Sequence, residues 1–105
     1  MSEETRRLEL QQKFEDILGT RNVYFQPPET LSMKYPCIVY FKDTVATSFA
    51  NNKLYKYKQG YTVTYIDEDP DSEIPFNIIK TFEYSRINSF YRSEGLNHTK
   101  LTIFY

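Results

Sequence analysis

The sequence contains few of the residues that most often build catalytic or metal centres. Its 105 residues include one cysteine (Cys37), one histidine (His98), three glycines and no tryptophan. A single cysteine cannot form an internal disulfide, and a single histidine excludes a His-rich metal site within one chain. The three glycines, Gly19, Gly60 and Gly95, are too far apart to form a glycine-rich phosphate loop. We therefore expect neither a cofactor nor a bound metal.

The chain also lacks a strong net charge and a long apolar run. Its formal net charge is −1, which provides no global field to attract nucleic acid or an anionic membrane. The longest apolar stretch, Tyr35–Phe41, is far shorter than a membrane span. The N-terminus does not follow the basic-then-apolar pattern of a signal peptide. We expect a protein made in cytoplasm, with no membrane and no sequence-specific nucleic acid among its partners, and with Cys37 buried under reducing conditions.

Aromatic residues, in contrast, are abundant, with 10 tyrosines and 8 phenylalanines. Phenylalanine can fill a core, whereas the tyrosine hydroxyl needs a partner or water and suits half-buried and interface positions. The preference of tyrosine for strands accounts for only part of this excess. We therefore expect some of the tyrosines to lie at a contact surface.

Length and periodicity predict one α+β domain over residues 1–105. No linker rich in proline, glycine or serine divides the chain, and its length suits a single core. Apolar residues recur at helical spacing from Leu10 to Leu18, and Gly19 follows as a natural stop. This pattern predicts a first helix over residues 3–18, with one stripe packed on a sheet.

Strand patterns follow this helix. Asn22–Gln26 is a short strand candidate, and Tyr35–Phe41 is apolar on both faces, as in a central strand of a covered sheet. Asp43–Lys53 is polar and contains an Asn-Asn pair, which predicts a loop that could serve as an arm. From Tyr55 to Tyr65, tyrosine and valine recur at odd positions while lysine and threonine recur at even ones. This period of two predicts a long strand with a projecting end and a bulge at Gly60.

A cluster of acidic residues separates this strand from a second helix. The carboxylates are those of Asp67, Glu68, Asp69, Asp71 and Glu73. The cluster lacks the glycine and the distal glutamate of a calcium-binding EF-hand loop. We therefore interpret it as a solvated turn, with Ser72 or Asp71 capping the next helix. An acidic collar facing a channel, or a contact for a neighbour's basic patch, remains a further possibility.

The last third of the chain predicts a helix and a hairpin. Apolar residues spaced by four over Ile74–Phe82 predict a helix with one buried stripe. Tyr84–Tyr91 and Lys100–Tyr105 are strand candidates, joined by a loop of more than two residues with Asn97 and His98 in the turn. The resulting fold is a mostly antiparallel sheet, with the N-terminal helix and the second helix packed on it.

Two constellations resemble functional sites but favour structural roles. Cys37 and His98 could act as nucleophile and base only by converging from separate strands, and no third group is placed to orient them. The lysines at 53, 56 and 58 interleave with tyrosines, as in sites for single-stranded nucleic acid. Period two, however, puts Lys56 and Lys58 on the opposite face from the tyrosines, so protection of a strand edge is the better interpretation. The sequence predicts no catalytic residue and no enzyme.

Four stretches carry a resemblance to a known family. They are Tyr35–Tyr40, Phe49–Asn52 leading into the tyrosine-rich strand, Asp67–Pro75, and Leu96-Asn97-His98 with the final strand. From Tyr35 onward the chain resembles the small tail-completion proteins of tailed bacteriophages, which act as tail terminators or head–tail joining proteins. The Asp-Pro-Asp-Ser-x-Ile-Pro and Leu-Asn-His pieces are the most specific. An acidic residue often follows this histidine in the family, whereas here the residue is Thr99, so no role of that acid is carried over.

The resemblance implies a virion protein of the tail or neck without an active site. It implies a ring of copies, six being the expected number, that caps the tail tube protein and docks to the head connector. With the strand pattern, it suggests an interface formed by Phe49, Asn51, Asn52, Tyr55, Tyr57 and Tyr61. The acidic turn would lie at a second interface or at the lumen. Two alternatives remain, a head-side adaptor or closure protein of the neck and a small host-directed binding protein.

Overall fold

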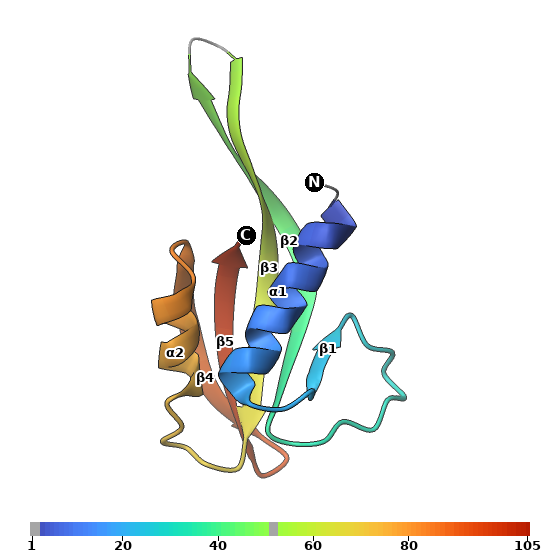
Figure 1. The fold of residues 1–105 in the computed structure, drawn as a ribbon. Coiled ribbons are helices and arrows are strands. Elements are labelled where there is room, and N and C mark those ends of the chain that lie inside the picture. The colour runs from blue at the N-terminus through green and yellow to red at the C-terminus, as the bar shows by residue number, and fades with distance from the viewer. Residues whose placement is uncertain (1–2, 51–52) are drawn as a thin grey trace.

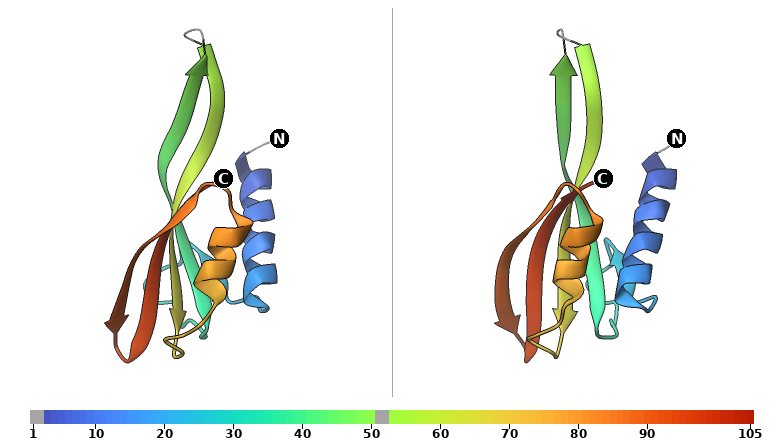
Figure 2. Two further views of the ribbon diagram at one scale, coloured as in Figure 1. Left: turned by 90° about the vertical axis from the view of Figure 1, so that its left-hand side faces the viewer. Right: turned by 60° about the vertical axis from the view of Figure 1, so that its left-hand side comes forward.

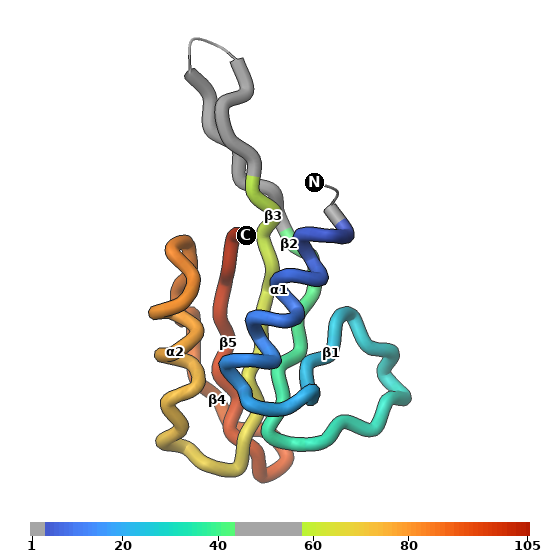
Figure 3. The backbone as a smooth tube through the Cα atoms, viewed as in Figure 1, coloured from blue at the N-terminus to red at the C-terminus, as the bar shows by residue number. Residues whose placement is uncertain are grey.

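In the computed structural model, two helices cover one face of a mixed, mostly antiparallel sheet (Figures 1 and 2). The structure describes the backbone of residues 3–50 and 53–105 and the side chains of residues 4–43 and 58–105 (Figure 3). The elements, in chain order, are α1 (Glu3–Leu18), β1 (Val23–Phe25), β2 (Cys37–Ala50), β3 (Lys53–Asp67), α2 (Ile74–Thr81), β4 (Ser85–Ser93) and β5 (Leu96–Phe104). The described strands form one sheet in the order β1-β2-β3-β5-β4. The predicted α+β fold with an N-terminal helix is confirmed.

Helix α1 ends at Leu18, as predicted, and buries the expected stripe. Leu10 and Phe14 are fully buried against the sheet, and Gly19, with a φ of 81°, ends the helix by donating its N–H to the carbonyl of Glu15. A polar residue, Gln11, also attaches α1 to the sheet. Its Oε1 accepts a hydrogen bond from the Tyr40 hydroxyl at 2.6 Å, and its Nε2 donates to the Val23 carbonyl at 3.0 Å.

The predicted Asp43–Lys53 loop is wrong. Strand β2 continues to Ala50 and β3 begins at Lys53, and these two residues are paired. The stretch after Asp43 contains valine, threonine and phenylalanine, which suit a strand, and β3 supplies the partner that the composition alone did not reveal. The ladder shifts register between Lys42 and Val45, so the irregularity predicted at Gly60 lies there but places its extra residue in β2.

Strand β3 occupies the centre of the sheet, between β2 and β5. Tyr61, Val63 and Tyr65 are buried on the helix-covered face, while Thr62 and Thr64 between them are only partly buried. The predicted alternation is therefore confirmed over these residues. The opposite face carries a smaller cluster in which Cys37, Val39 and Ile66 are buried, with partly buried Tyr24, Met33 and Leu96 packed against it. The prediction that Tyr35–Phe41 is covered on both faces is confirmed for Cys37–Tyr40, whereas Tyr35 and Phe41 are exposed.

The β4–β5 hairpin differs from its predicted form. Its turn consists of Glu94 and Gly95 alone, with φ values of 54° and 79°. Positive φ at both positions is the geometry of a two-residue type I′ turn. The predicted longer loop is therefore wrong, and Asn97 and His98 lie within β5 instead of in a turn. Strand β4 forms one edge of the sheet.

Candidate functional site

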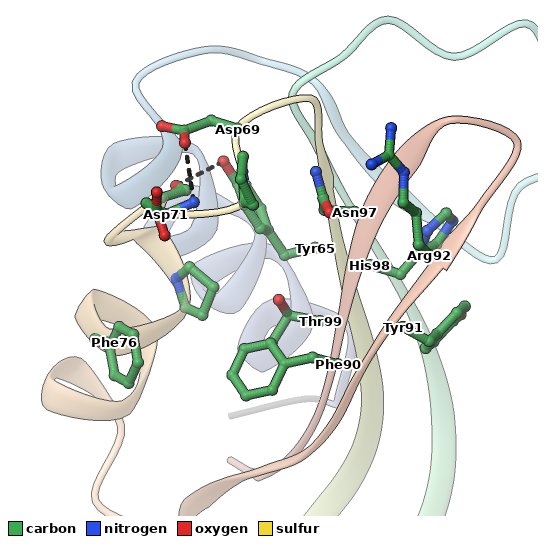
Figure 4. Close-up of a pocket in the computed structure, with 13 residues that line it drawn as sticks. Tyr65, Asp69, Asp71, Phe76, Phe90, Tyr91, Arg92, Asn97, His98 and Thr99 are labelled. Carbon is green, nitrogen blue, oxygen red and sulfur yellow. Dashed lines mark hydrogen bonds between the residues drawn. The ribbon is translucent and has the colours of Figure 1, made fainter.

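An open cleft of about 580 Å³ lies at the end of the sheet where β3 leads into α2. One wall is formed by the loop after β3 and the first turn of α2, including Asp69, Asp71 and Phe76. The β4–β5 hairpin forms the facing wall, including Phe90 and Asn97 (Figure 4). We call this feature the acidic cleft and residues 67–73 the acidic loop.

A hydrogen-bond network holds the acidic loop in place. The buried Tyr65 hydroxyl donates to Oδ2 of Asp67 and lies 3.0 Å from Oγ of Ser72. Oγ of Ser72 accepts the N–H of Ile74 at 3.3 Å. The predicted capping of α2 by Ser72 or Asp71 is wrong, because the N-cap residue is Glu73 and no side chain forms a cap hydrogen bond. Within the loop, Oδ1 of Asp69 accepts the N–H of Asp71 at 2.9 Å. The loop is therefore tied both to β3 and to α2.

The acidic loop is strongly negative on its exposed side. Glu68, Asp69, Asp71 and Glu73 are exposed, whereas Asp67 is partly buried by its contact with Tyr65. Residues 67–73 contain five carboxylates and no lysine or arginine. Such a loop, with its backbone fixed and its carboxylates in solvent, is suited to contact a cationic partner.

Both walls carry an exposed phenylalanine, and the facing wall is connected to the acidic loop. Phe90 on β4 and Phe76 on α2 are 63% and 52% exposed, unusually high for phenylalanine. The Asn97 side chain donates from Nδ2 to the carbonyl of Glu68 at 3.0 Å, which joins β5 to the loop. Arg92 lines the cleft and donates to the carbonyl of Gly95 at 3.3 Å. The cleft therefore combines negative charge with exposed aromatic surface.

Two predicted turn residues have specific places beside this cleft. Asn97 forms the bond to the acidic loop, and His98 stacks on Tyr91 with ring centroids 4.8 Å apart. Nδ1 of His98 lies 3.2 Å from the carbonyl oxygen of Leu96, a local backbone contact. The register of β4 and β5 pairs Tyr91 with His98, so the stack is a cross-strand contact.

The predicted interface residues separate into two groups. Tyr61 is 1% exposed and packs against Tyr40 in the core, so its assignment to an interface is wrong for the folded chain. Its ring belongs to the core cluster that contains Leu10 and Phe14 of α1, together with Val63 and Tyr65 of the same strand. The side chains of Phe49, Tyr55 and Tyr57 lie outside the described side chains, and Asn51 and Asn52 lie outside the described residues.

Cys37 and His98 occupy one row of the sheet but do not meet. Cys37 pairs with Ile66 on β3, and Ile66 pairs with His98 on β5. One strand therefore separates the two, which corresponds to roughly 10 Å across two strand spacings. Cys37 is fully buried, and burial raises the pKa of its thiol to about 11. This cysteine is a protonated core residue near neutral pH, and His98 is not placed to accept its proton.

The raised pKa of Cys37 predicts a loss of stability in alkali. Because the folded pKa lies above the usual value of 9.0, the unfolded chain ionises first, and stability present below about pH 9 falls as the pH approaches 11. Burial and the bond to Asp67 likewise raise the pKa of Tyr65, which adds to the fall at higher pH. Each such group contributes about 1.4 kcal/mol per pH unit within its window.

Urea denaturation at pH 7, 9 and 11 measures this loss. The Cys37→Ala variant should start less stable, but its free energy of unfolding should decline by about 2 kcal/mol less between pH 9 and 11. Equal declines in the two proteins would contradict the assignment to the thiol.

No protein-family model matches this chain, and no curated protein matches it. Of the helices in the described residues, none is long and apolar enough to cross a membrane. In the described part of the chain, no group of three or more His, Cys, Asp or Glu residues could hold a metal ion. The candidate site therefore rests on the geometry and chemistry of the acidic cleft itself.

The sequence patterns predict no role for the two exposed phenylalanines of the cleft. Phe76 lies between the positions of the buried stripe of α2, and Phe90 lies on an edge strand. The position of Phe76 is a signal that the sequence does contain. If Ile74, Ile78 and Phe82 face the core, Phe76 lies on another side of the helix. For Phe90, the exposure is consistent with the position of β4 at the edge of the sheet.

Proposed function

We propose that this protein completes the tail of a bacteriophage as a virion assembly component. In this role copies form a ring, with six as the expected number, that caps the tail tube and contacts the head connector. The observation that supports this most is the extension of β2 and β3 as a two-stranded ribbon (residues 45–50 and 53–58) past the end of β5 (Figure 1). No third strand pairs with this ribbon in the described backbone.

A ribbon of this kind suits an assembly role for a physical reason. Two strands alone are marginally stable in water, because they bury little apolar surface. Contact with a neighbouring molecule covers the ribbon and supplies the missing partner surface. The overall dimensions of 50 × 23 × 23 Å describe an elongated protein whose reach exceeds that of its core. Elements that reach a neighbour produce the heterologous contacts from which rings are built.

Exposed aromatic residues offer further contact surfaces. Phe41, Tyr91 and Phe90 are 45%, 48% and 63% exposed, and they lie on β2 and on the edge strand β4. Aromatic side chains of this kind are enriched at protein interfaces. A ring component that meets the tube on one side and the connector on the other needs more than one such surface. The sequence resemblance supports a phage tail protein, and the projecting ribbon and the exposed aromatic side chains support a role in assembly.

Electron microscopy of phage particles assembled without this protein tests the proposal. We expect overlong tails without heads, because tube growth would not be stopped and the connector would find no docking surface. Supplying the wild-type protein in trans is the control, and it should restore tails of normal length attached to heads.

Other outcomes distinguish the alternatives. Tails of normal length beside DNA-filled, unattached heads would assign the protein to head–tail joining as a neck adaptor or closure protein. Complete particles formed without the protein would contradict any role in assembly. A host-directed binding protein, which would remain monomeric and bind a cellular target, would then be the better interpretation.

A further inference from the structure

The two ends of β3 carry opposite charge. Residues 44–66 contain no acidic residue and include Lys53, Lys56 and Lys58. Immediately after them, the acidic loop contains five carboxylates and no cation. We call residues 53–58 the basic segment. One strand therefore connects a positive end to a negative end, with the core residues Tyr61, Val63 and Tyr65 between them.

The length of β3 keeps these two ends apart within one molecule. Lys53 and Asp67 are the first and last residues of a 15-residue strand. At about 3.3 Å per residue, the strand spans roughly 45 Å. The longest dimension of the protein, 50 Å, agrees with this span. The basic segment of one chain therefore cannot reach the acidic cleft of the same chain, and any contact between them must join two molecules.

We propose that the acidic cleft binds the basic segment of a second copy, which joins copies head to tail. The inference rests on the ring of the proposed function and names the contact that closes it. The occupant follows from charge complementarity, because the basic segment contains three lysines and the acidic loop contains five carboxylates. A contact between two different surfaces of the same protein is heterologous, and it closes into a ring when the rotation per copy allows.

The two walls of the cleft also suit the two kinds of residue in the basic segment. Its lysines are accompanied by two tyrosines, Tyr55 and Tyr57. One wall of the cleft presents the exposed carboxylates of the acidic loop, and the facing wall presents Phe90 (Figure 4). An extended segment between these walls can pair its lysines with carboxylates and pack its tyrosines on an aromatic ring.

Reciprocal charge reversal tests this contact, with light scattering after size-exclusion chromatography as the measurement. The cleft variant is Asp69→Lys/Asp71→Lys, and the segment variant is Lys53→Glu/Lys56→Glu. Each should weaken self-association by roughly a hundredfold, because like charges would face each other across the contact. The combined variant should recover association, since the charges are again opposite. Raised salt should weaken the wild-type complex, as for any contact between exposed charges.

Two controls separate this effect from general charge and from misfolding. Glu29→Lys/Glu83→Lys adds the same charge at exposed positions outside the acidic cleft and should leave association unchanged. The exchange of Asp69 removes a bond within the loop, so Phe90→Ser provides a second cleft variant that touches no such bond. It should fold normally, by circular dichroism, and still associate more weakly.

The outcomes distinguish this inference from the function on which it rests. If the wild type associates and both charge variants associate equally well, this contact is wrong, while a ring formed through other surfaces stands. If the wild type remains monomeric up to its solubility limit, both the contact and the ring are overturned. If the cleft variant self-associates normally but no longer binds tail tubes, the cleft accepts a tube segment and the second-copy assignment is wrong.

Discussion

The Tyr61→Ser variant is expected to lose most of the stability of the isolated domain. Tyr61 is 1% exposed, and its ring lies 5.8 Å from that of Tyr40 in an edge-to-face contact. Serine would leave a cavity between β3 and α1 and place a small polar group in it. Truncation of a buried aromatic residue costs roughly 3–5 kcal/mol, against a total stability of about 5–15 kcal/mol for a small domain. Urea denaturation followed by circular dichroism measures the change.

Thr62→Ser is the matched control for this variant. Thr62 is the next residue of β3, lies on the opposite face, and donates its hydroxyl to Oδ2 of Asp43 at 2.7 Å. Serine retains that hydroxyl, so the expected loss is at most about 1 kcal/mol. A Tyr61→Ser protein with wild-type stability but weaker self-association would contradict the core assignment and return Tyr61 to an interface.

A second large effect is expected for Phe14→Ala. Phe14 is fully buried, and its ring lies 5.1 Å from that of Tyr40 and 5.5 Å from that of Phe82. It therefore contacts the sheet and the residue that ends α2 at the same time. Alanine would remove both contacts and open a cavity, at an expected cost of roughly 3–5 kcal/mol. The midpoint of thermal unfolding should fall by more than about 10 °C.

Leu8→Ala on the same helix is the comparison. Leu8 is 52% exposed, and alanine has the higher helix propensity, so the stability should change by less than about 0.5 kcal/mol. Similar melting temperatures for the two variants would mean that α1 does not pack through Phe14.

The parts of the fold that could be predicted are those encoded by a local period. The apolar stripe of α1 recurs from Leu10 to Leu18, and the alternation of β3 is confirmed over Tyr61–Tyr65. The turn of the β4–β5 hairpin lacked such a signal. Type I′ turns favour Asn-Gly or Asp-Gly, whereas here Glu94 precedes Gly95 and adopts positive φ itself. The residues from Ser93 to His98 therefore predict a longer loop.

The sequence indicates only one of the two walls of the acidic cleft. The five carboxylates and their proximity to α2 were evident, because they are adjacent in the chain. The facing wall depends on β4 and β5 folding back on β3, and it is tied to the loop by the bond between Asn97 and Glu68, which are 29 residues apart.

The predicted role of Tyr61 is wrong for a similar reason. The period of two in the sequence indicates which residues of a long strand share a face. Which part of β3 lies in the core depends on β5, and β5 pairs with β3 only from Gly60 onward.

The pairing of β2 with β3, which runs to Ala50 and Lys53 with register shifts after Lys42 and after Ser48, restricts how this hairpin can change in length during evolution. Each residue added to or removed from one strand exchanges its two faces, so a single deletion between the core and the basic segment would turn every side chain beyond it to the other side. Deletion of two residues from each strand preserves the faces and shortens the span by roughly 7 Å. Related chains should therefore vary in this hairpin in steps of two residues per strand, except where a bulge such as the one after Lys42 accommodates a single residue.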